Sequence, residues 1–310
     1  MAKSGYIQII RKCNQKCIAC SNPSNEREIT LAGAKKEIGA LKRSGHIEVI
    51  LTGGEPTLHP KLPEMITYAV KNKIPPRVIT NGQKISNINY LKKLQKAGLQ
   101  NLNLSIYSNI AKIQHKLSKK KDSLKNIKKS LDNISKVGIE ANLNILINKY
   151  NSNNLSGLVS WIIKKYPAIN HFVFNNIDPF MNRVSKNPDV VARFNDFELE
   201  LHLALEMLQK NKKTFRVERV PLCYMTDYEY ASTETRKIVK NEVRTIFFLD
   251  EKGEHTNNQW KHQQSESCKV CFLQKICAGA DTRGGYYKKE ELYPVFIDPQ
   301  KIIEKVNKKN

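Results

Sequence analysis

Three of the seven cysteines, Cys13, Cys17 and Cys20, lie within eight residues in the segment CNQKCIAC. Thiolates bind soft metals and iron–sulfur clusters, and short spacings let one loop present several sulfurs to one centre. A structural zinc site normally uses four protein ligands, whereas this segment supplies three. Three sulfurs on a four-iron cluster leave one iron free for another ligand. The spacing therefore predicts a cluster with an open coordination position.

A second group of cysteines lies near the other end of the chain. Cys268, Cys271 and Cys277 are spaced closely in CKVCFLQKICAGAD, and an isolated Cys223 precedes them in VPLCYM. The short spacings indicate a second metal centre, with a zinc knuckle as the alternative to an iron–sulfur cluster. Cys223 has three interpretations: a buried structural residue, a ligand of the second centre, or a catalytic thiol. We favour the catalytic thiol at this point.

The elements that must position these cysteines alternate between short β-rich and longer helical segments up to about residue 212. Glycines and prolines stand where helices should end. This β-then-α rhythm, repeated about six times, predicts an α/β fold with parallel strands and helices packed outside. It is an open relative of the eight-fold barrel, in which chemistry lies at the carboxyl ends of the strands. The predicted strands are 6–10, 47–52, 77–80, 101–106, 140–147 and 171–175, and the predicted helices are 31–44, 60–72, 87–98, 121–137, 154–165 and 196–211.

The rhythm changes after residue 212. Residues 214–225 suggest an extended segment, and residues 244–260 suggest a hairpin that turns at 251–253. We therefore expect two domains, a barrel over 1–212 and a small C-terminal domain over 213–310.

The composition indicates where in the cell the protein is expected and which partners it is expected to bind. No apolar run approaches the roughly 20 residues that cross a bilayer, and the N-terminus lacks a signal peptide, so we expect a cytoplasmic protein with reduced thiols. The net charge of +23 invites a nucleic-acid partner. The lysines crowd residues 115–130 without interleaved aromatic residues that could stack on bases. The pattern therefore does not favour nucleic acid, and an acidic peptide would exploit the same positive field.

The segment CNQKCIAC resembles the CxxxCxxC signature of radical S-adenosylmethionine (SAM) enzymes, and the resemblance continues through GGEP and ITNG to about residue 180. It implies a partial (β/α)6 barrel and a 4Fe–4S cluster bound by Cys13, Cys17 and Cys20. SAM would bind the open iron, and its cleavage would give a 5′-deoxyadenosyl radical that abstracts hydrogen. By position in the family, the residues implied to contact SAM are Gly53, Gly54, Glu55, Pro56, Asn81, Ser105 and Asn144.

The second cysteine group resembles the start of the auxiliary-cluster motif in SPASM and twitch domains, the C-terminal extensions of many radical SAM enzymes. The full motif has a further cysteine four residues after the third, where this chain has Asp281, and a distal cysteine is absent. The resemblance therefore implies a truncated domain with one auxiliary 4Fe–4S cluster. Its fourth ligand is left open between Asp281, solvent or substrate, and Cys223.

Length, the reduced auxiliary motif and the isolated Cys223 most resemble radical SAM peptide epimerases of the epipeptide type. The resemblance implies that the enzyme inverts L- to D-residues in a ribosomally made precursor peptide, with Cys223 returning a hydrogen atom to the Cα radical. A one-electron donor such as flavodoxin or ferredoxin would supply the reductant. One alternative is a maturase that forms a thioether or carbon–carbon crosslink in a peptide. Another, from a different class, is an RNA-binding protein that modifies tRNA.

Overall fold

A single curved sheet organises the chain, and the computed structural model describes residues 4–22, 25–178, 183–250 and 253–308. The strand order is β7-β6-β5-β4-β3-β2-β1-β8-β9, with all neighbours parallel except β8 and β9. The strands are β1 Ser4–Ile10, β2 Glu48–Gly53, β3 Pro76–Thr80, β4 Asn101–Ile106, β5 Glu140–Ile147, β6 His171–Asn176, β7 Thr214–Glu218, β8 Arg244–Phe247 and β9 Glu254–Asn257. The fold class expected from the βα rhythm is confirmed.

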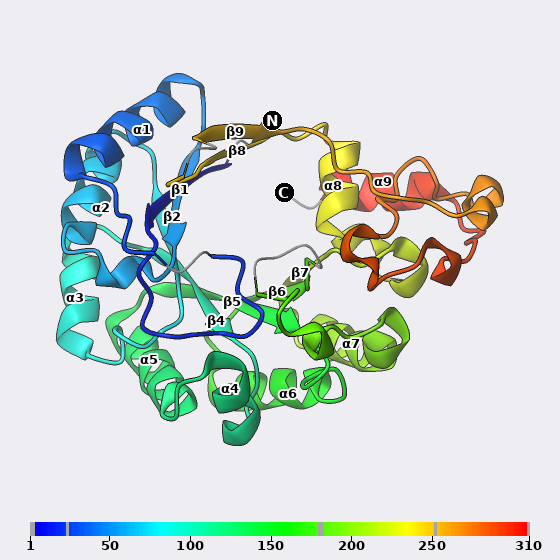
Figure 1. The fold of residues 1–310 in the computed structure, drawn as a ribbon, viewed down its shortest axis with the longest axis horizontal. Helices are drawn as coiled ribbons and strands as arrows, with labels where there is room; N and C mark the ends of the chain where they lie inside the picture. Colours follow the sequence, from blue (N-terminus) through cyan, green and yellow to red (C-terminus); the bar gives the residue numbers. More distant parts are fainter. Residues whose placement is uncertain (1–3, 23–24, 179–182, 251–252, 309–310) are drawn as a thin grey trace.

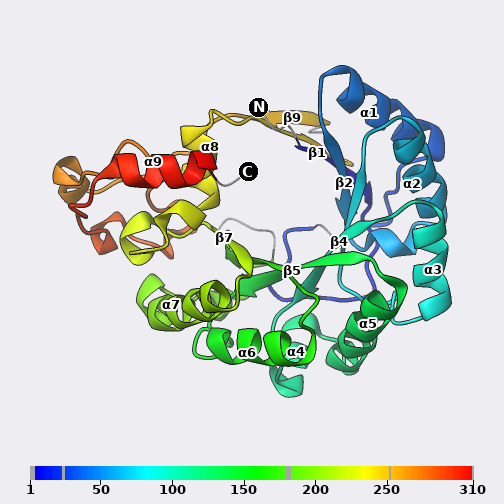
Figure 2. The ribbon, with the colours of Figure 1, turned by 180° about the vertical axis from the view of Figure 1, so that it is seen from behind.

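Helices cover the outer face of the sheet, and its ends do not meet (Figure 1). The helices are α1 Leu31–Arg43, α2 Leu62–Lys71, α3 Ile88–Lys96, α4 Ala111–Ser118, α5 Ser123–Val137, α6 Leu155–Lys165, α7 Phe194–Lys210, α8 Thr233–Val239 and α9 Pro299–Lys308. The view from behind shows α8 and α9 beside the open side of the barrel, near α7 (Figure 2). An open barrel leaves a route for a substrate into its interior.

Local sequence explains most of these boundaries. Thr30 caps α1 by accepting a hydrogen bond from the backbone N–H of Gly33, and α5 ends where Gly138 takes a left-handed conformation at φ 76°. The six strands and six helices expected before residue 212 are present. We did not predict α4, which is short and polar and immediately precedes α5.

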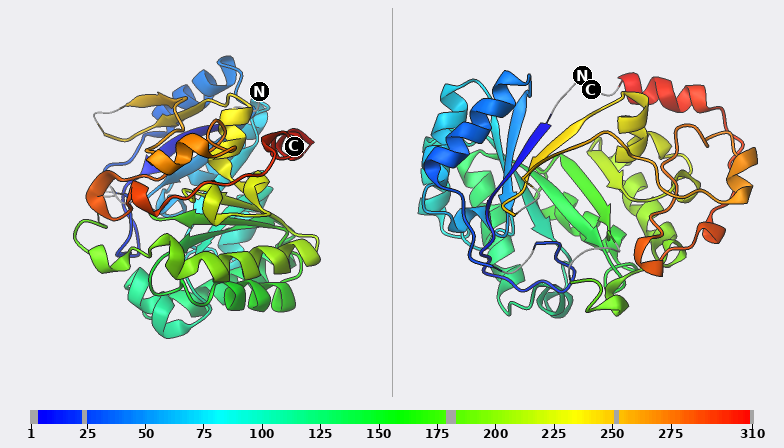
Figure 3. Two further views of the ribbon diagram at one scale, coloured as in Figure 1. Left: turned by 90° about the vertical axis from the view of Figure 1, so that its right-hand side faces the viewer. Right: turned by 45° about the horizontal axis from the view of Figure 1, so that its top comes forward.

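The expected boundary at residue 212 does not separate two sheets. β7 pairs in parallel with β6, and β8 pairs in parallel with β1, so both strands extend the barrel sheet at its two sides. The reason is that β6 and β1 would otherwise present unpaired backbone groups at open edges. The hairpin of β8 with β9 forms as expected, with residues 251–252 of its turn outside the described residues. The segment after β9 forms the small, loop-rich part beside the barrel (Figure 3).

Within the described part of the chain, none of the helices combines the length and the apolar character needed to cross a membrane.

Candidate functional site

The loop that carries Cys13, Cys17 and Cys20 follows β1 and crosses one end of the barrel (Figure 1). Backbone hydrogen bonds tie it to the end of α4: Lys16 N–H donates to Ser118 O at 3.2 Å, and Ile18 N–H donates to Leu117 O at 3.0 Å. The helix that the sequence did not predict therefore anchors the first cysteine motif.

The GGEP segment holds the other end of this loop. Gly54 N–H donates to Ile10 O at 2.6 Å, and Glu55 N–H donates to Lys12 O at 3.0 Å. A Cβ atom on Gly54 would lie 2.2 Å from Arg11 O, a distance that side chains do not tolerate. These glycines are therefore required for close approach of two backbones, a role separate from the SAM contact implied by resemblance.

The carboxylate of Glu55 is buried and fully engaged. It accepts hydrogen bonds from the hydroxyls of Thr57 and Thr80, both at 2.6 Å, and from Asn81 N–H at 2.7 Å. Burial raises the pKa of Glu55. The amide of Asn81 in turn lies 3.7 Å from Cys13 Sγ, donor nitrogen to sulfur. Glu55 therefore braces the residue that contacts the first cysteine.

Two of the first three cysteines, Cys13 and Cys17, are largely shielded from water. Burial raises the pKa of Cys17 to about 12 and that of Cys13 to about 11, and the nearby Cys20 adds to both shifts. Tyr107 hydrogen-bonds with Cys17, and the guanidinium of Arg183 donates to Cys17 O at 3.1 Å. Thiolates here need a cationic partner, which iron provides, so the donor chemistry fits an iron–sulfur cluster.

A single metal ion fits less well. Among the described residues, no three or more His, Cys, Asp or Glu side chains converge closely enough to hold one metal ion. A 4Fe–4S cluster does not need such convergence, because each cysteine binds a different iron.

The barrel encloses a cavity of about 510 Å³. Cys20 and Ala19 lie on its wall together with Ser105 and Asn144, which are register partners on β4 and β5. Ser105 and Asn144 therefore share a cavity wall with the cysteine loop, and their contact with SAM stays a prediction. The described residues on the wall do not include the GGEP segment or Asn81. The wall also includes residues that we did not identify, among them Tyr107, Asn175, Glu218 and Arg219. All four lie at or just beyond the ends of strands, and this position in the predicted strands could have identified them from the sequence.

The cavity wall is strongly cationic. Its described residues include five arginines but only two carboxylates, Glu48 and Glu218. Arg77 pairs with Glu48 at 3.0 Å, whereas no described carboxylate lies within 4.0 Å of Arg216 or Arg244. Burial and then repulsion from Arg236 lower the pKa of Arg216 to about 10. The remaining arginines on the wall are Arg219 and Arg236. This interior is suited to an anionic group.

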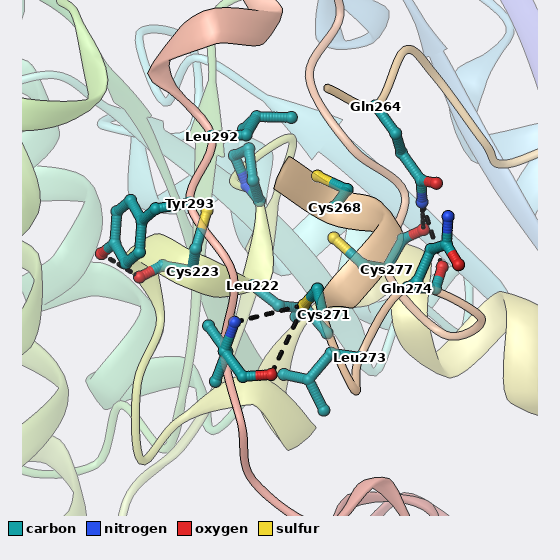
Figure 4. A pocket seen from close by; sticks show the side chains of 12 residues that line it. Leu222, Cys223, Gln264, Cys268, Cys271, Leu273, Gln274, Cys277, Leu292 and Tyr293 are labelled. Carbon is teal, nitrogen blue, oxygen red and sulfur yellow. Dashed lines mark hydrogen bonds between the residues drawn. The ribbon is translucent and has the colours of Figure 1, made fainter. Parts of the chain in front are cut away.

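A second, smaller pocket contains the other cysteines. Cys223, Cys268, Cys271 and Cys277 line it together with apolar side chains (Figure 4). The sequence led us to expect Cys223 to face the reacting substrate, but among the described residues on the barrel cavity wall the only cysteine is Cys20. The difference arises because the chain turns away from the barrel directly after β7, into the short helix Leu222–Tyr224.

Asp281 is not among the described residues that line the cysteine pocket, and its side chain is paired with an arginine. Its carboxylate oxygens accept hydrogen bonds from Arg283, at 2.8 Å from Nε and 2.5 Å from the terminal nitrogen, and Asp281 is not among the described residues that line the cysteine pocket. The carboxylate thus makes a bidentate ion pair with Arg283, and ligation by Asp281 stays a prediction.

Comparison with known proteins places the chain in a family. A family model described as the Radical SAM superfamily matches residues 7–162. The chain is 27% identical over 189 residues to a 7,8-dihydro-6-hydroxymethylpterin dimethyltransferase of Methanocaldococcus jannaschii, covering 58% of this chain and 37% of the relative. It is 26% identical over 168 residues to a PqqA peptide cyclase of Xanthomonas campestris pv. campestris, covering 51% and 43%.

Among solved structures, SuiB of Streptococcus suis bound to SAM shares the fold with a TM-score of 0.68 at 16% identity, covering 96% of this chain and 77% of SuiB. SuiB bound to its precursor peptide SuiA gives a TM-score of 0.67 at 15% identity, covering 94% and 75%. The chain thus spans about two fifths of the two curated relatives and about three quarters of SuiB.

Proposed function

The chain belongs to the radical SAM superfamily, and from this we propose that it modifies a peptide by hydrogen abstraction inside the barrel cavity. The family implies a 4Fe–4S cluster and SAM. Support for a peptide comes from the fold shared with SuiB, solved with a precursor peptide, and from sequence similarity to a peptide cyclase. The observation that carries the proposal is the large cavity with Cys20 on its wall.

The residues of the chain have separable tasks in this proposal. Cys13, Cys17 and Cys20 would hold the cluster, which together with SAM supplies a carbon radical when bound. The backbone N–H groups of Gly54 and Glu55 join the segment after β2 to the end of β1 and the start of the cysteine loop. Ser105 and Asn144, side by side on the cavity wall, present the polar groups that SAM's carboxylate and ribose require. The backbone of residues 53–56 would meet the amino group of SAM.

The charges on the cavity wall favour an acidic peptide. Arg216 and Arg244 lie on β7 and β8, at the two sides of the open barrel, and neither has a described carboxylate within 4.0 Å. Carboxylates act on both only from further away, Glu242 on Arg216 and Glu218 and Glu234 on Arg244. A carboxylate of the peptide would supply the missing charge and draw the chain into the cavity. A one-electron donor such as flavodoxin or ferredoxin remains an expected partner.

The position of Cys223 bears on the outcome of the reaction. Epimerisation needs a thiol that returns hydrogen to the face of Cα opposite the abstraction, and the described cavity wall carries no cysteine besides the cluster residue Cys20. A thioether or carbon–carbon crosslink needs no such donor. It removes one hydrogen atom and then one proton and one electron, and the electron needs an acceptor, for which a cluster in the second cysteine pocket is suited. We therefore favour crosslinking over epimerisation.

Mass spectrometry of a reacted peptide separates the two outcomes. We expect anaerobically reconstituted enzyme, given SAM, reductant and the precursor peptide encoded beside its gene, to lower the peptide mass by two hydrogens, about 2 Da. This follows because a crosslink breaks two bonds to hydrogen and forms one new bond. In deuterated water the crosslinked carbon should take up no solvent deuterium. An unchanged connectivity with deuterium at Cα and a D-residue on chiral analysis would instead establish the epimerase. No change in any peptide, with SAM cleavage intact, would overturn the peptide proposal.

Replacing Arg216 with glutamine tests the acidic-substrate proposal. We expect R216Q to raise the melting temperature of the peptide-free enzyme by about 2–4 °C, because it removes a half-buried cation that has no described carboxylate within 4.0 Å. It should also weaken binding of the precursor peptide by about tenfold or more, measured by calorimetry, because a charged hydrogen bond is lost.

The matched control is R43Q, which changes an exposed arginine at the end of α1 and should leave both quantities unchanged. A lower melting temperature for R216Q together with unaltered peptide affinity would assign Arg216 to structure alone.

A further inference from the structure

We propose that Cys223 is the fourth protein ligand of an auxiliary 4Fe–4S cluster, completing a site with Cys268, Cys271 and Cys277. This inference refines the proposed function, because it assigns the second cysteine pocket a cluster with no iron left open to substrate. It also gives Cys223 a role other than hydrogen return.

The four cysteines reach one pocket from separate parts of the chain. Cys223 lies on the short helix after β7, Cys268 lies on the short helix Glu266–Val270, and Cys271 directly follows that helix. Cys277 comes from the next turn of the loop. Figure 4 shows the four sulfurs around one common space, with Cys223 on the side opposite Cys268 and Cys277. Four cysteines around one space are the usual ligand set of a 4Fe–4S cluster.

Hydrogen-bond donors point at the sulfurs as they do around cluster ligands. Val295 N–H lies 3.3 Å from Cys271 Sγ, and Gly279 N–H lies 3.3 Å from Cys277 Sγ. Gly279 can make this approach because its φ is 80° and a Cβ there would lie 2.2 Å from Gln263 O. Such donors stabilise thiolates and tune the potential of the iron that they bind. A merely packed thiol would not require them.

Most of the remaining wall is apolar, and Gln264, Gln274 and Tyr293 complete it. Leu222, Leu273, Leu292 and Val295 surround the sulfurs. Four sulfurs in so dry a pocket can ionise only with a strong cationic centre among them. The pocket therefore fits a metal centre better than free cysteines.

The spacing of the side chains favours a cluster over zinc. A Cys₄ zinc site requires all four sulfurs at about 2.3 Å from one ion. Within the described part of the chain, no three Cys, His, Asp or Glu side chains converge on one point, and this includes the group that contains Cys223. A cube of four irons binds one cysteine at each of four corners, so its ligands need not converge on one point.

Iron counting and electron paramagnetic resonance (EPR) test the ligand assignment without any peptide. The starting protein is the full chain with Cys13, Cys17 and Cys20 replaced by alanine, so that only the second site can hold iron. After anaerobic reconstitution we expect about four irons per chain and a reduced 4Fe–4S EPR signal. Adding Cys223→Ala should lower the iron content at least severalfold or convert the signal to that of a three-iron cluster. Adding Cys223→Ser, whose oxygen can still bind iron, should retain four irons with a shifted signal.

A variant of the same pocket without a thiol controls for packing. Leu292→Ala removes a side chain from the wall and should keep about four irons with an unchanged signal. Retention of four irons and an identical EPR signal in Cys223→Ala would overturn the assignment, and so would zinc in place of iron in the starting protein. Equal iron loss in Leu292→Ala and both Cys223 variants would show that packing, rather than ligation, is being measured, and would overturn it as well. Because no peptide enters the experiment, its failure is separate from failure of the peptide proposal.

Discussion

Replacing Cys17 with alanine is expected to abolish SAM cleavage, lowering its rate by about three orders of magnitude or more. Cys17 is the most buried of the first three cysteines, 8% exposed, and it lies between the two hydrogen bonds that tie the loop to α4. Without its sulfur, the loop offers only two ligands to the cluster. The readouts are 5′-deoxyadenosine formation with SAM and dithionite, and iron content, which should fall by about four per chain.

The control for Cys17→Ala lies on the same loop. Lys16 is exposed, and only its backbone takes part in the contact with Ser118. Lys16→Ala should therefore keep both the iron content and the rate of SAM cleavage. If Cys17→Ala retained four irons at this site and cleaved SAM at a comparable rate, the assignment of Cys13, Cys17 and Cys20 as cluster ligands would be wrong.

Replacing Gly54 with alanine is expected to destabilise the fold by about 3 kcal/mol or more and to prevent cluster assembly at the first site. The added Cβ would lie 2.2 Å from Arg11 O and 2.4 Å from Lys12 O, both backbone atoms that cannot rotate away. Relief requires the segment that leads to Cys13 to move out from β2. Thermal unfolding followed by circular dichroism measures the first effect, and iron content measures the second.

Gly39→Ala is the matched control for Gly54→Ala. Gly39 lies inside α1, where the nearest atom to an added Cβ is the mobile end of Arg43 at 3.2 Å. Alanine favours helix over glycine by up to about 1 kcal/mol, so this variant should be unchanged or slightly more stable. An unfolding transition and an iron content for Gly54→Ala that match the parent protein would show that the close approach of the two backbones is not needed.

The sequence alone predicted the features that depend on residues close to one another along the chain. The βα rhythm predicted the order of strands and helices up to residue 212, because side-chain periodicity reflects which face of each element is buried. The spacing in CNQKCIAC predicted a cluster loop, and their places on the fourth and fifth predicted strands made Ser105 and Asn144 candidates for contact with SAM. The helix α4 was missed because eight mostly polar residues carry little periodic signal.

Contacts between distant segments required the tertiary structure. Glu55 was expected beside SAM, yet its carboxylate accepts hydrogen bonds from Thr80 and Asn81 and thereby braces Cys13. The sequence offered Asp281 as a candidate ligand, and only the structure shows that its carboxylate pairs with Arg283. The strands β7 and β8 were assigned to a separate domain until their pairing placed both in the barrel sheet.

Cys223 shows most clearly the difference between what the sequence indicates and what the tertiary structure adds. From the sequence alone it was an isolated thiol with three possible roles, because nothing within its own short helix identifies its neighbours. Only a few residues separate Cys13, Cys17 and Cys20, and an extended backbone spans about 3.5 Å per residue. These three cysteines must therefore lie close together, so the spacing alone predicts that they form one group. No such limit relates Cys223 to Cys268, Cys271 and Cys277. Only the packing of the C-terminal loops against the turn after β7 brings the four sulfurs to one pocket.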